Sequence, residues 1–238
     1  MLNAEVFSYA FLIGFVPVFV WLCFWLYEDS KHPEPSKLIL RAFLGGMACV
    51  LLVIPLQKVA ADYMTVGFFL ILTWAALEEV LKFLVAWVLV LRNSAVDEPL
   101  DPPVYLITVA LGFAALENTL FLITPLANGQ FEHGLITGNL RFIGATLIHT
   151  LSSAVIGAAL AFSFYRENYE KVVYALFGVI LAILLHTFFN FSIIQTGVDW
   201  LLLVFASVWV GIMFLLLMLE RIKLIRRPAW WEKMFIRK

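Results

Sequence analysis

Several side chains that could activate a water molecule lie inside apolar stretches of the sequence. They are Glu78, Glu79, Lys82, Glu117, His149 and His186. A charge at mid-bilayer costs about 2.5–3.5 kcal/mol on insertion scales, so such groups must face one another or a wet cavity rather than lipid. Carboxylates act as general bases, and together with histidines they also bind catalytic metal ions. These residue types therefore favour a site that activates water.

The spacing within residues 78–82 brings two carboxylates and one basic group onto one face of a helix. At 100° per residue, Lys82 projects about 40° from Glu78 and about 60° from Glu79. Lys82 can neutralise one glutamate, which leaves the second available as a general base or a metal ligand. We expect Lys82 to support the site.

Two asparagines accompany the ionisable residues. Asn190 follows His186 by four residues, so both project from one helix face and can contact the same substrate carbonyl or water. Asn118 directly follows Glu117 and lies on a neighbouring face. We expect Asn190 to belong to the catalytic set and Asn118 to support it.

The composition places these residues in a membrane protein. Of 238 residues, 63% are hydrophobic and 14% are charged, and the mean hydropathy is +0.96, far above that of a soluble domain. Seven apolar runs reach the roughly 20 residues needed to cross a bilayer. The sequence thus predicts an all-α integral membrane protein with about seven transmembrane helices in one polytopic domain, residues 1–238. The predicted spans are roughly 5–26, 38–60, 66–91, 104–126, 139–164, 172–195 and 199–220, followed by a basic tail, 221–238.

The distribution of Lys and Arg predicts the orientation of the chain. Thirteen of the 16 basic residues fall on one side of these spans, and seven of the thirteen lie in the tail. Lys58 and Arg141 fall on the other side. The positive-inside rule then places the N-terminus outside and the C-terminus in the cytoplasm, for a multi-pass protein of the cell (cytoplasmic) membrane. This asymmetry concerns orientation and indicates no nucleic-acid partner.

With this topology, the buried polar residues share one depth. At about 1.5 Å per residue, Glu78 lies about 18 Å from the outer end of its span and His149 about 15 Å. Glu117 and His186 lie about 14 Å from the outer ends of theirs. Random placement would rarely bring four residues from four helices to one level. The sequence therefore predicts a single polar site in the outer half of the membrane.

The sequence resembles the PrsW family of intramembrane proteases in four motifs that occur in the family's order. They are LEEVLKF at 77–83, GFAALEN at 112–118, His149 with Gly157 eight residues later, and HTFFN at 186–190. The first loop with Pro33-Glu34-Pro35 and the turn Asp97-Glu98-Pro99 are similar to that family as well. The resemblance covers most of residues 20–195.

The resemblance implies endoproteolysis of a single-pass membrane protein near the extracytoplasmic side, with anti-sigma factors as the known substrate class. PrsW proteins are related to CAAX prenyl-endopeptidases and bacteriocin-processing proteases, in which a glutamate pair and two histidines activate water and an asparagine helps hold the oxyanion. At the matching positions of this chain, the resemblance implies that Glu78 or Glu79 activates water together with His149. It also implies that His186 and Asn190 stabilise the oxyanion. Glu117 stands where those relatives have histidine, and a carboxylate cannot donate a hydrogen bond unless it is protonated.

Two versions of this chemistry fit the residues. In the glutamate-dependent version no metal is needed, because a buried carboxylate serves as the base. In the metal-dependent version zinc is held by the histidines and one or two carboxylates, the candidate ligands being His149, His186, Glu79 and Glu117. The sequence lacks the His-Glu-x-x-His motif of soluble zinc proteases, and on sequence alone the metal-independent version is preferred.

Two other classes of function would also place polar residues in a membrane. A proton-coupled transporter or channel uses intramembrane Glu, Lys and His as proton relays, but the paired Gly/Pro interruptions typical of two repeated halves are not found in the sequence. A catalytically silent scaffold would have no use for residues whose insertion is this costly. The sequence therefore favours a membrane-embedded protease, with the transporter as the alternative.

Overall fold

The structure is a computed structural model that describes residues 4–28, 30, 32–195 and 198–229. These described residues form helices joined by short connections, with no strand among them. The helices are α1 (Ala4–Glu28), α2 (Ser36–Tyr63), α3 (Phe68–Ala86), α4 (Asp101–Ala127), α5 (Phe131–Leu140), α6 (Thr146–Phe162), α7 (Asn168–Gln195) and α8 (Val198–Ile222), with π-helical segments η1 (Trp87–Leu91) and η2 (Arg141–Ala145). The predicted all-α fold is confirmed. The part of the predicted basic tail beyond residue 229 lies outside the described residues.

Among the described residues, six helices are long and apolar enough to cross a membrane. One of them is the continuous helix Phe131–Phe162, made of α5, η2 and α6, which begins earlier than the predicted span at 139. The chain turns at Gly129, whose φ is 73°, and this allows a new helix to start directly after α4. The predicted span 66–91 corresponds to α3 with η1 and is not one of the six, because α3 contains Glu78, Glu79 and Lys82. The chain is a multi-pass membrane protein.

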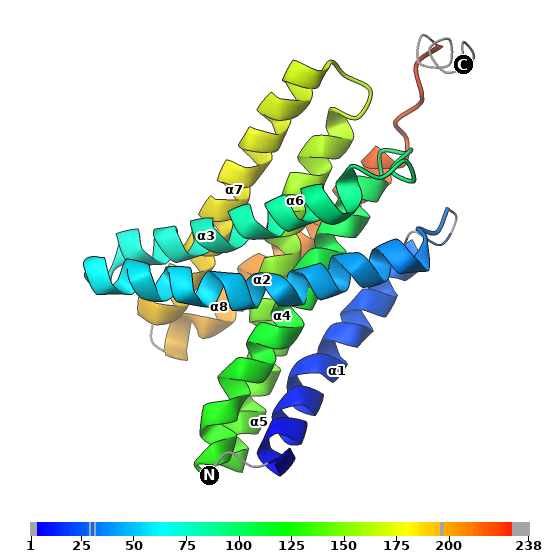
Figure 1. Ribbon diagram of the computed structural model, residues 1–238. Coiled ribbons are helices and arrows are strands. Elements are labelled where there is room, and N and C mark those ends of the chain that lie inside the picture. Colours follow the sequence, from blue (N-terminus) through cyan, green and yellow to red (C-terminus); the bar gives the residue numbers. More distant parts are fainter. Residues whose placement is uncertain (1–3, 29, 31, 196–197, 230–238) are drawn as a thin grey trace.

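Helix α4 lies at the centre of the fold and packs against α1, α2 and α6 (Figure 1). Two glycines permit its contact with α2. A Cβ atom at Gly46 would lie 2.0 Å from the carbonyl oxygen of Val109, and one at Gly112 would lie 2.0 Å from that of Phe43. Small residues let membrane helices approach closely, so these glycines fix how α2 lies against α4.

Helices α2 and α3 form a hairpin that crosses α4 and α6 at a steep incline in Figure 1. The hairpin therefore brings its polar side chains against three other helices, namely α4, which follows it in the chain, and the more distant α6 and α7. Outward-facing apolar side chains such as Leu51, Phe69 and Leu202 are exposed, as expected where helices contact lipid. The inward faces of the hairpin position the candidate site.

Candidate active site

A buried cluster of ionisable side chains lies where α3, α4, α6 and α7 meet. Helix α3 contributes Glu78, Glu79 and Lys82, which are at most 4% exposed. Helices α6 and α7 contribute His149 and His186, which are 2% and 1% exposed. Glu117 of α4 completes the cluster and retains 18% side-chain exposure. The structure thus brings together the six ionisable residues identified in the sequence.

Glu79 is held on several sides. Its Oε1 atom lies 2.5 Å from Lys82 Nζ and 2.7 Å from His186 Nδ1. Its Oε2 atom accepts a hydrogen bond from Ser153 Oγ at 3.3 Å. The carboxylate that Lys82 neutralises is therefore Glu79, as an i, i+3 pair on α3. Because an ion-paired carboxylate is an acceptor only, we infer that His186 Nδ1 carries the proton and that its Nε2 lone pair is free.

Both ring nitrogens of His149 also have buried polar partners. Its Nε2 atom lies 3.0 Å from Glu117 Oε2, and its Nδ1 atom lies 3.3 Å from Lys82 Nζ. Glu117 is ion-paired with Arg141 and hence is also an acceptor only. We infer that Nε2 of His149 donates to Glu117 and that the Nδ1 lone pair, on the side of Glu78, accepts a hydrogen bond from Lys82 Nζ.

Glu78 lies between the two imidazoles. Its Oε1 atom accepts a hydrogen bond of 2.7 Å from Gln57 Nε2. Its Oε2 atom is 3.8 Å from His149 Nδ1 and 3.7 Å from His186 Nε2, and it has no hydrogen-bond partner among the described residues. An unsatisfied buried oxygen is costly. This oxygen lies between two imidazole nitrogens, an arrangement that suits the binding of a metal ion or of a reacting water.

The donor atoms of Glu78, His149 and His186 fit a metal ion. One ligand atom from each lies within 4.8 Å of the others, and among the described residues no other group of three has this property. Ligand atoms of a tetrahedral zinc site lie about 3.4 Å apart, given bonds of about 2.0–2.2 Å, so small side-chain shifts would close the site. The carboxylate in this group is Glu78, whereas the sequence had suggested Glu79 and Glu117. Those two glutamates instead contact the outward nitrogens of the histidines.

Sequence reasoning missed two residues of the site, Gln57 and Arg141. Gln57 lies on α2, and its backbone carbonyl accepts a hydrogen bond from Trp74 Nε1 at 3.0 Å. Arg141 lies in η2, donates from Nε to Asn118 Oδ1 at 2.6 Å and pairs through Nη2 with Glu117. The positive-inside count places Arg141 among the charges on the outer side of the spans, where it would have no role in the site. An arginine within the apolar helix 131–162 is itself a signal of function, and so is its place in a π-helical turn.

The two predicted asparagines differ in their surroundings. Asn118 is buried, donates to Thr146 Oγ1 at 3.0 Å and accepts from Arg141, so it links α4 to α6 and η2. Asn190 lies one turn beyond His186, is half-buried, and has no side-chain hydrogen bond to any described residue.

Comparison with known proteins agrees with the geometry. Residues 34–218 match the sequence model of a family described as PrsW family intramembrane metalloprotease. The Protease PrsW of Bacillus subtilis (strain 168) is 28% identical over 181 residues, 75% of this chain and 79% of the relative. That of Shouchella clausii is 28% identical over 192 residues, 78% and 84% of the two chains. That of Geobacillus kaustophilus is 32% identical over 150 residues, 60% and 62% of the two chains. No solved structure matches the chain.

Proposed function

The chain belongs to the PrsW family of intramembrane metalloproteases, and from this premise we propose that it cleaves a peptide bond of a single-pass membrane protein near the extracytoplasmic side of the bilayer. The substrate class that we propose is an anti-sigma factor, which is the class implied by the family resemblance. The observation that carries the proposal is the Oε2 atom of Glu78, which is buried between His149 and His186 and has no hydrogen-bond partner in the described part of the chain.

Glu78, His149 and His186 are the residues that would hold the metal, because two histidines and one carboxylate form a donor set used in catalytic zinc sites. When bound, zinc would polarise the scissile carbonyl and generate hydroxide at neutral pH in its open coordination position. The family description favours this version over the metal-independent one that the sequence alone preferred. In the metal-independent version the same Oε2 atom of Glu78 accepts the proton of the attacking water.

The surrounding residues hold these three side chains in place. Gln57 fixes Oε1 of Glu78, so that Oε2 faces the histidines. Glu79 and Glu117 each accept a hydrogen bond from one imidazole, which sets the tautomer and the ring orientation. Lys82 and Arg141 balance the charge of these two carboxylates. The chain therefore supplies a rigid set of donor atoms before substrate arrives.

Substrate approaches the site from the side of Glu117 and Arg141. These are its partly exposed members, with 18% and 15% side-chain exposure, whereas Glu78, Glu79 and the histidines are at most 5% exposed. The buried ring of Phe113 lies against His149, with centroids 5.1 Å apart, and forms an apolar wall of the site. We assign the amide of Asn190 to stabilising the oxyanion, because this side chain makes no hydrogen bond to a described residue that it would have to break in order to donate to substrate.

The experiment that tests this function uses protein purified into lipid nanodiscs with a panel of fluorescent single-pass substrates. Wild type is compared with Glu78→Gln, His149→Ala and His186→Ala, with and without a chelator, and bound zinc is measured by elemental analysis. We expect cleavage to be lost in all three variants and by chelation, and to return with zinc. The matched control Asp62→Asn, which removes an exposed carboxylate, should cleave normally.

Each other result has a defined meaning. Cleavage that needs Glu78 but survives chelation with no zinc bound would establish the glutamate-activated version. If wild type cleaves no substrate, while the Glu78 variant loses proton flux in liposomes, the protein is a transporter and the proposed function is wrong.

A further inference from the structure

Lys82 contacts both a carboxylate and an imidazole of the candidate site. Its Nζ atom lies 2.5 Å from Glu79 Oε1 and 3.3 Å from His149 Nδ1. The side chain is fully buried, and its ammonium group also lies over the ring of Phe113, 5.1 Å from the centroid. An ammonium group can only donate hydrogen bonds, so Nδ1 of His149 is the acceptor in this contact. Lys82 therefore occupies the lone pair of this nitrogen.

This lone pair is the one that His149 would offer to a metal ion. Nδ1 is the ring nitrogen on the side of Glu78, whose Oε2 atom is 3.8 Å away, whereas Nε2 lies against Glu117. A neutral imidazole has a single acceptor nitrogen, and its lone pair can bind a hydrogen-bond donor or a metal ion, but not both. For His149 to bind a metal together with Glu78 and His186, the hydrogen bond from Lys82 must break.

The charge of Lys82 acts in the same direction as its hydrogen bond. Like charges repel more strongly in a buried site than in water, because the effective dielectric constant is lower. The Nζ atom is 3.3 Å from the nitrogen that would bind the metal, so its positive charge opposes a dication at that position. Lys82 thus lowers the affinity of the site for metal in two ways.

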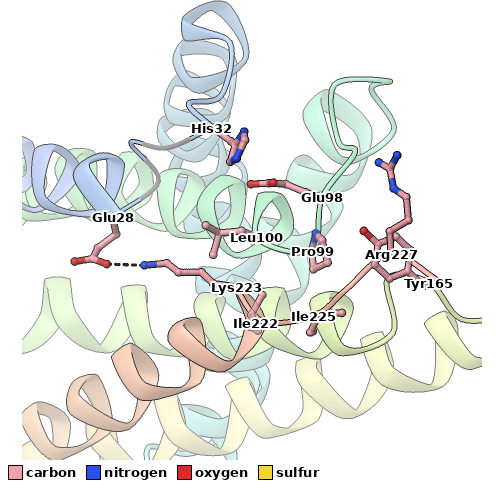
Figure 2. Close-up of a pocket in the computed structure, with 10 residues that line it drawn as sticks. All are labelled: Glu28, His32, Glu98, Pro99, Leu100, Tyr165, Ile222, Lys223, Ile225 and Arg227. Carbon is pink, nitrogen blue, oxygen red and sulfur yellow. Dashed lines mark hydrogen bonds and ion pairs between the residues drawn. The ribbon is translucent and has the colours of Figure 1, made fainter. Parts of the chain in front are cut away.

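A second ion-paired lysine, Lys223, contacts carboxylates and no histidine among the described residues. Its Nζ atom lies 3.0 Å from Glu28 Oε2, in the cleft shown in Figure 2, and 2.6 Å from Glu220 Oε1. The same cleft, of about 350 Å³, is lined by Leu100. Leu100 precedes Glu117 by 17 residues, or about 26 Å along α4. Lys223 is therefore a matched control for a lysine whose only role is to pair with carboxylates.

We propose that Lys82 competes with the metal ion for His149, and that metal binding leaves Lys82 paired with Glu79 alone. The inference rests on the metal-dependent form of the proposed function. Without metal, Lys82 keeps His149 hydrogen-bonded and offsets the buried charge of Glu79, so the donor atoms stay together. Lys82 therefore weakens metal binding and stabilises the metal-free site.

Zinc titration of the purified protein in nanodiscs, in competition with a chelating dye, measures this effect without any substrate. We expect Lys82→Met, which has a side chain of similar length and no charge, to bind zinc at least tenfold more tightly than wild type. The metal-free variant should unfold at a lower temperature than metal-free wild type, because Glu79 loses its buried partner. Added zinc should reduce this difference. The control Lys223→Met should bind zinc as wild type does.

A second background covers the case in which Lys82→Met does not fold. In Glu79→Gln the amide oxygen still accepts the hydrogen bond from His186. Adding Lys82→Met to it leaves no buried carboxylate without its partner. Zinc should bind at least tenfold more tightly to this double variant than to Glu79→Gln alone.

The opposite sign overturns the proposal. If Lys82 serves only to hold Glu79 against His186, its removal should weaken zinc binding, as expected when a residue behind a metal ligand is lost. Weaker or unchanged affinity, or a wild type that binds no zinc, contradicts the competition. None of these results depends on cleavage. A protein that shows the expected competition for zinc but cleaves no substrate would contradict the proposed function alone.

Discussion

Each histidine of the cluster contacts a carboxylate on the side that faces away from Glu78. His186 contacts Glu79, and His149 contacts Glu117. Each of these carboxylates is in turn paired with a basic residue, Lys82 or Arg141. Carboxylates behind metal-binding histidines orient the rings and increase their basicity. In the proposed metal site, Glu117 would orient His149 in this way, a role that a carboxylate performs well.

At the scale of single residues, we predict that Arg141→Gln lowers both zinc affinity and the cleavage rate by about 10–100-fold. This is the usual effect of removing a residue that holds a metal ligand in place. Glutamine cannot contact Glu117 and Asn118 simultaneously, so Glu117 loses its counter-charge and His149 its fixed orientation. Zinc competition assays and initial cleavage rates provide the measurement.

The matched control is Arg166→Gln, which breaks an ion pair with Glu170 in which the arginine side chain is 49% exposed. It should alter neither quantity by more than about twofold, because exposed pairs contribute little. Normal zinc affinity in Arg141→Gln would show that Arg141 does not position His149.

At the scale of elements, the site depends on how closely the α2–α3 hairpin approaches α4. The glycine contact between α2 and α4 sets this distance, and the same hairpin carries Gln57 and Glu78 to the cluster. A change far from the cluster should therefore affect both stability and catalysis.

We predict that Gly46→Ala destabilises the protein by about 1–3 kcal/mol, the usual range for overpacking. The added Cβ would meet the backbone of Val109 at 2.0 Å, which cannot move aside as a flexible side chain can. Thermal unfolding in detergent measures the effect. The same substitution at Gly67, where a Cβ meets nothing within 4 Å, should leave the unfolding temperature unchanged. Equal behaviour of the two variants would mean that close α2–α4 packing is not needed.

At the scale of the whole molecule, we predict the orientation from the charges of the loops. By the positive-inside rule the α4–α5 turn would lie outside and the α6–α7 turn in the cytoplasm. This predicted orientation is the one that the proposed cleavage on the extracytoplasmic side requires.

We predict that a membrane-impermeant maleimide labels Asn128→Cys in intact cells but not Glu167→Cys, both positions being exposed. The background carries Cys23→Ser to remove the exposed native thiol, and Cys49 is buried. Permeabilised cells provide the control, since both cysteines should then react. The reverse labelling pattern would invert the topology and place the catalytic cluster nearer the cytoplasm.

The sequence by itself determined the membrane class, the all-helical fold and the residues able to activate water. Crossing a bilayer requires a local run of apolar residues, so the apolar helices could be located from hydropathy. A buried charge is costly anywhere along such a run, so Glu78, Glu79, Lys82 and Glu117 were conspicuous without any knowledge of their neighbours.

The tertiary structure alone decided which atoms face one another. Helical spacing placed Lys82 between Glu78 and Glu79, but only packing against His186 and Ser153 assigned Lys82 to Glu79 and left Glu78 facing the histidines. Gln57 of α2 reaches Glu78 of α3 because these two helices pack against each other as a hairpin. Contacts between helices depend on their crossing angles and on close approach at glycines, and neither is a local property of the sequence.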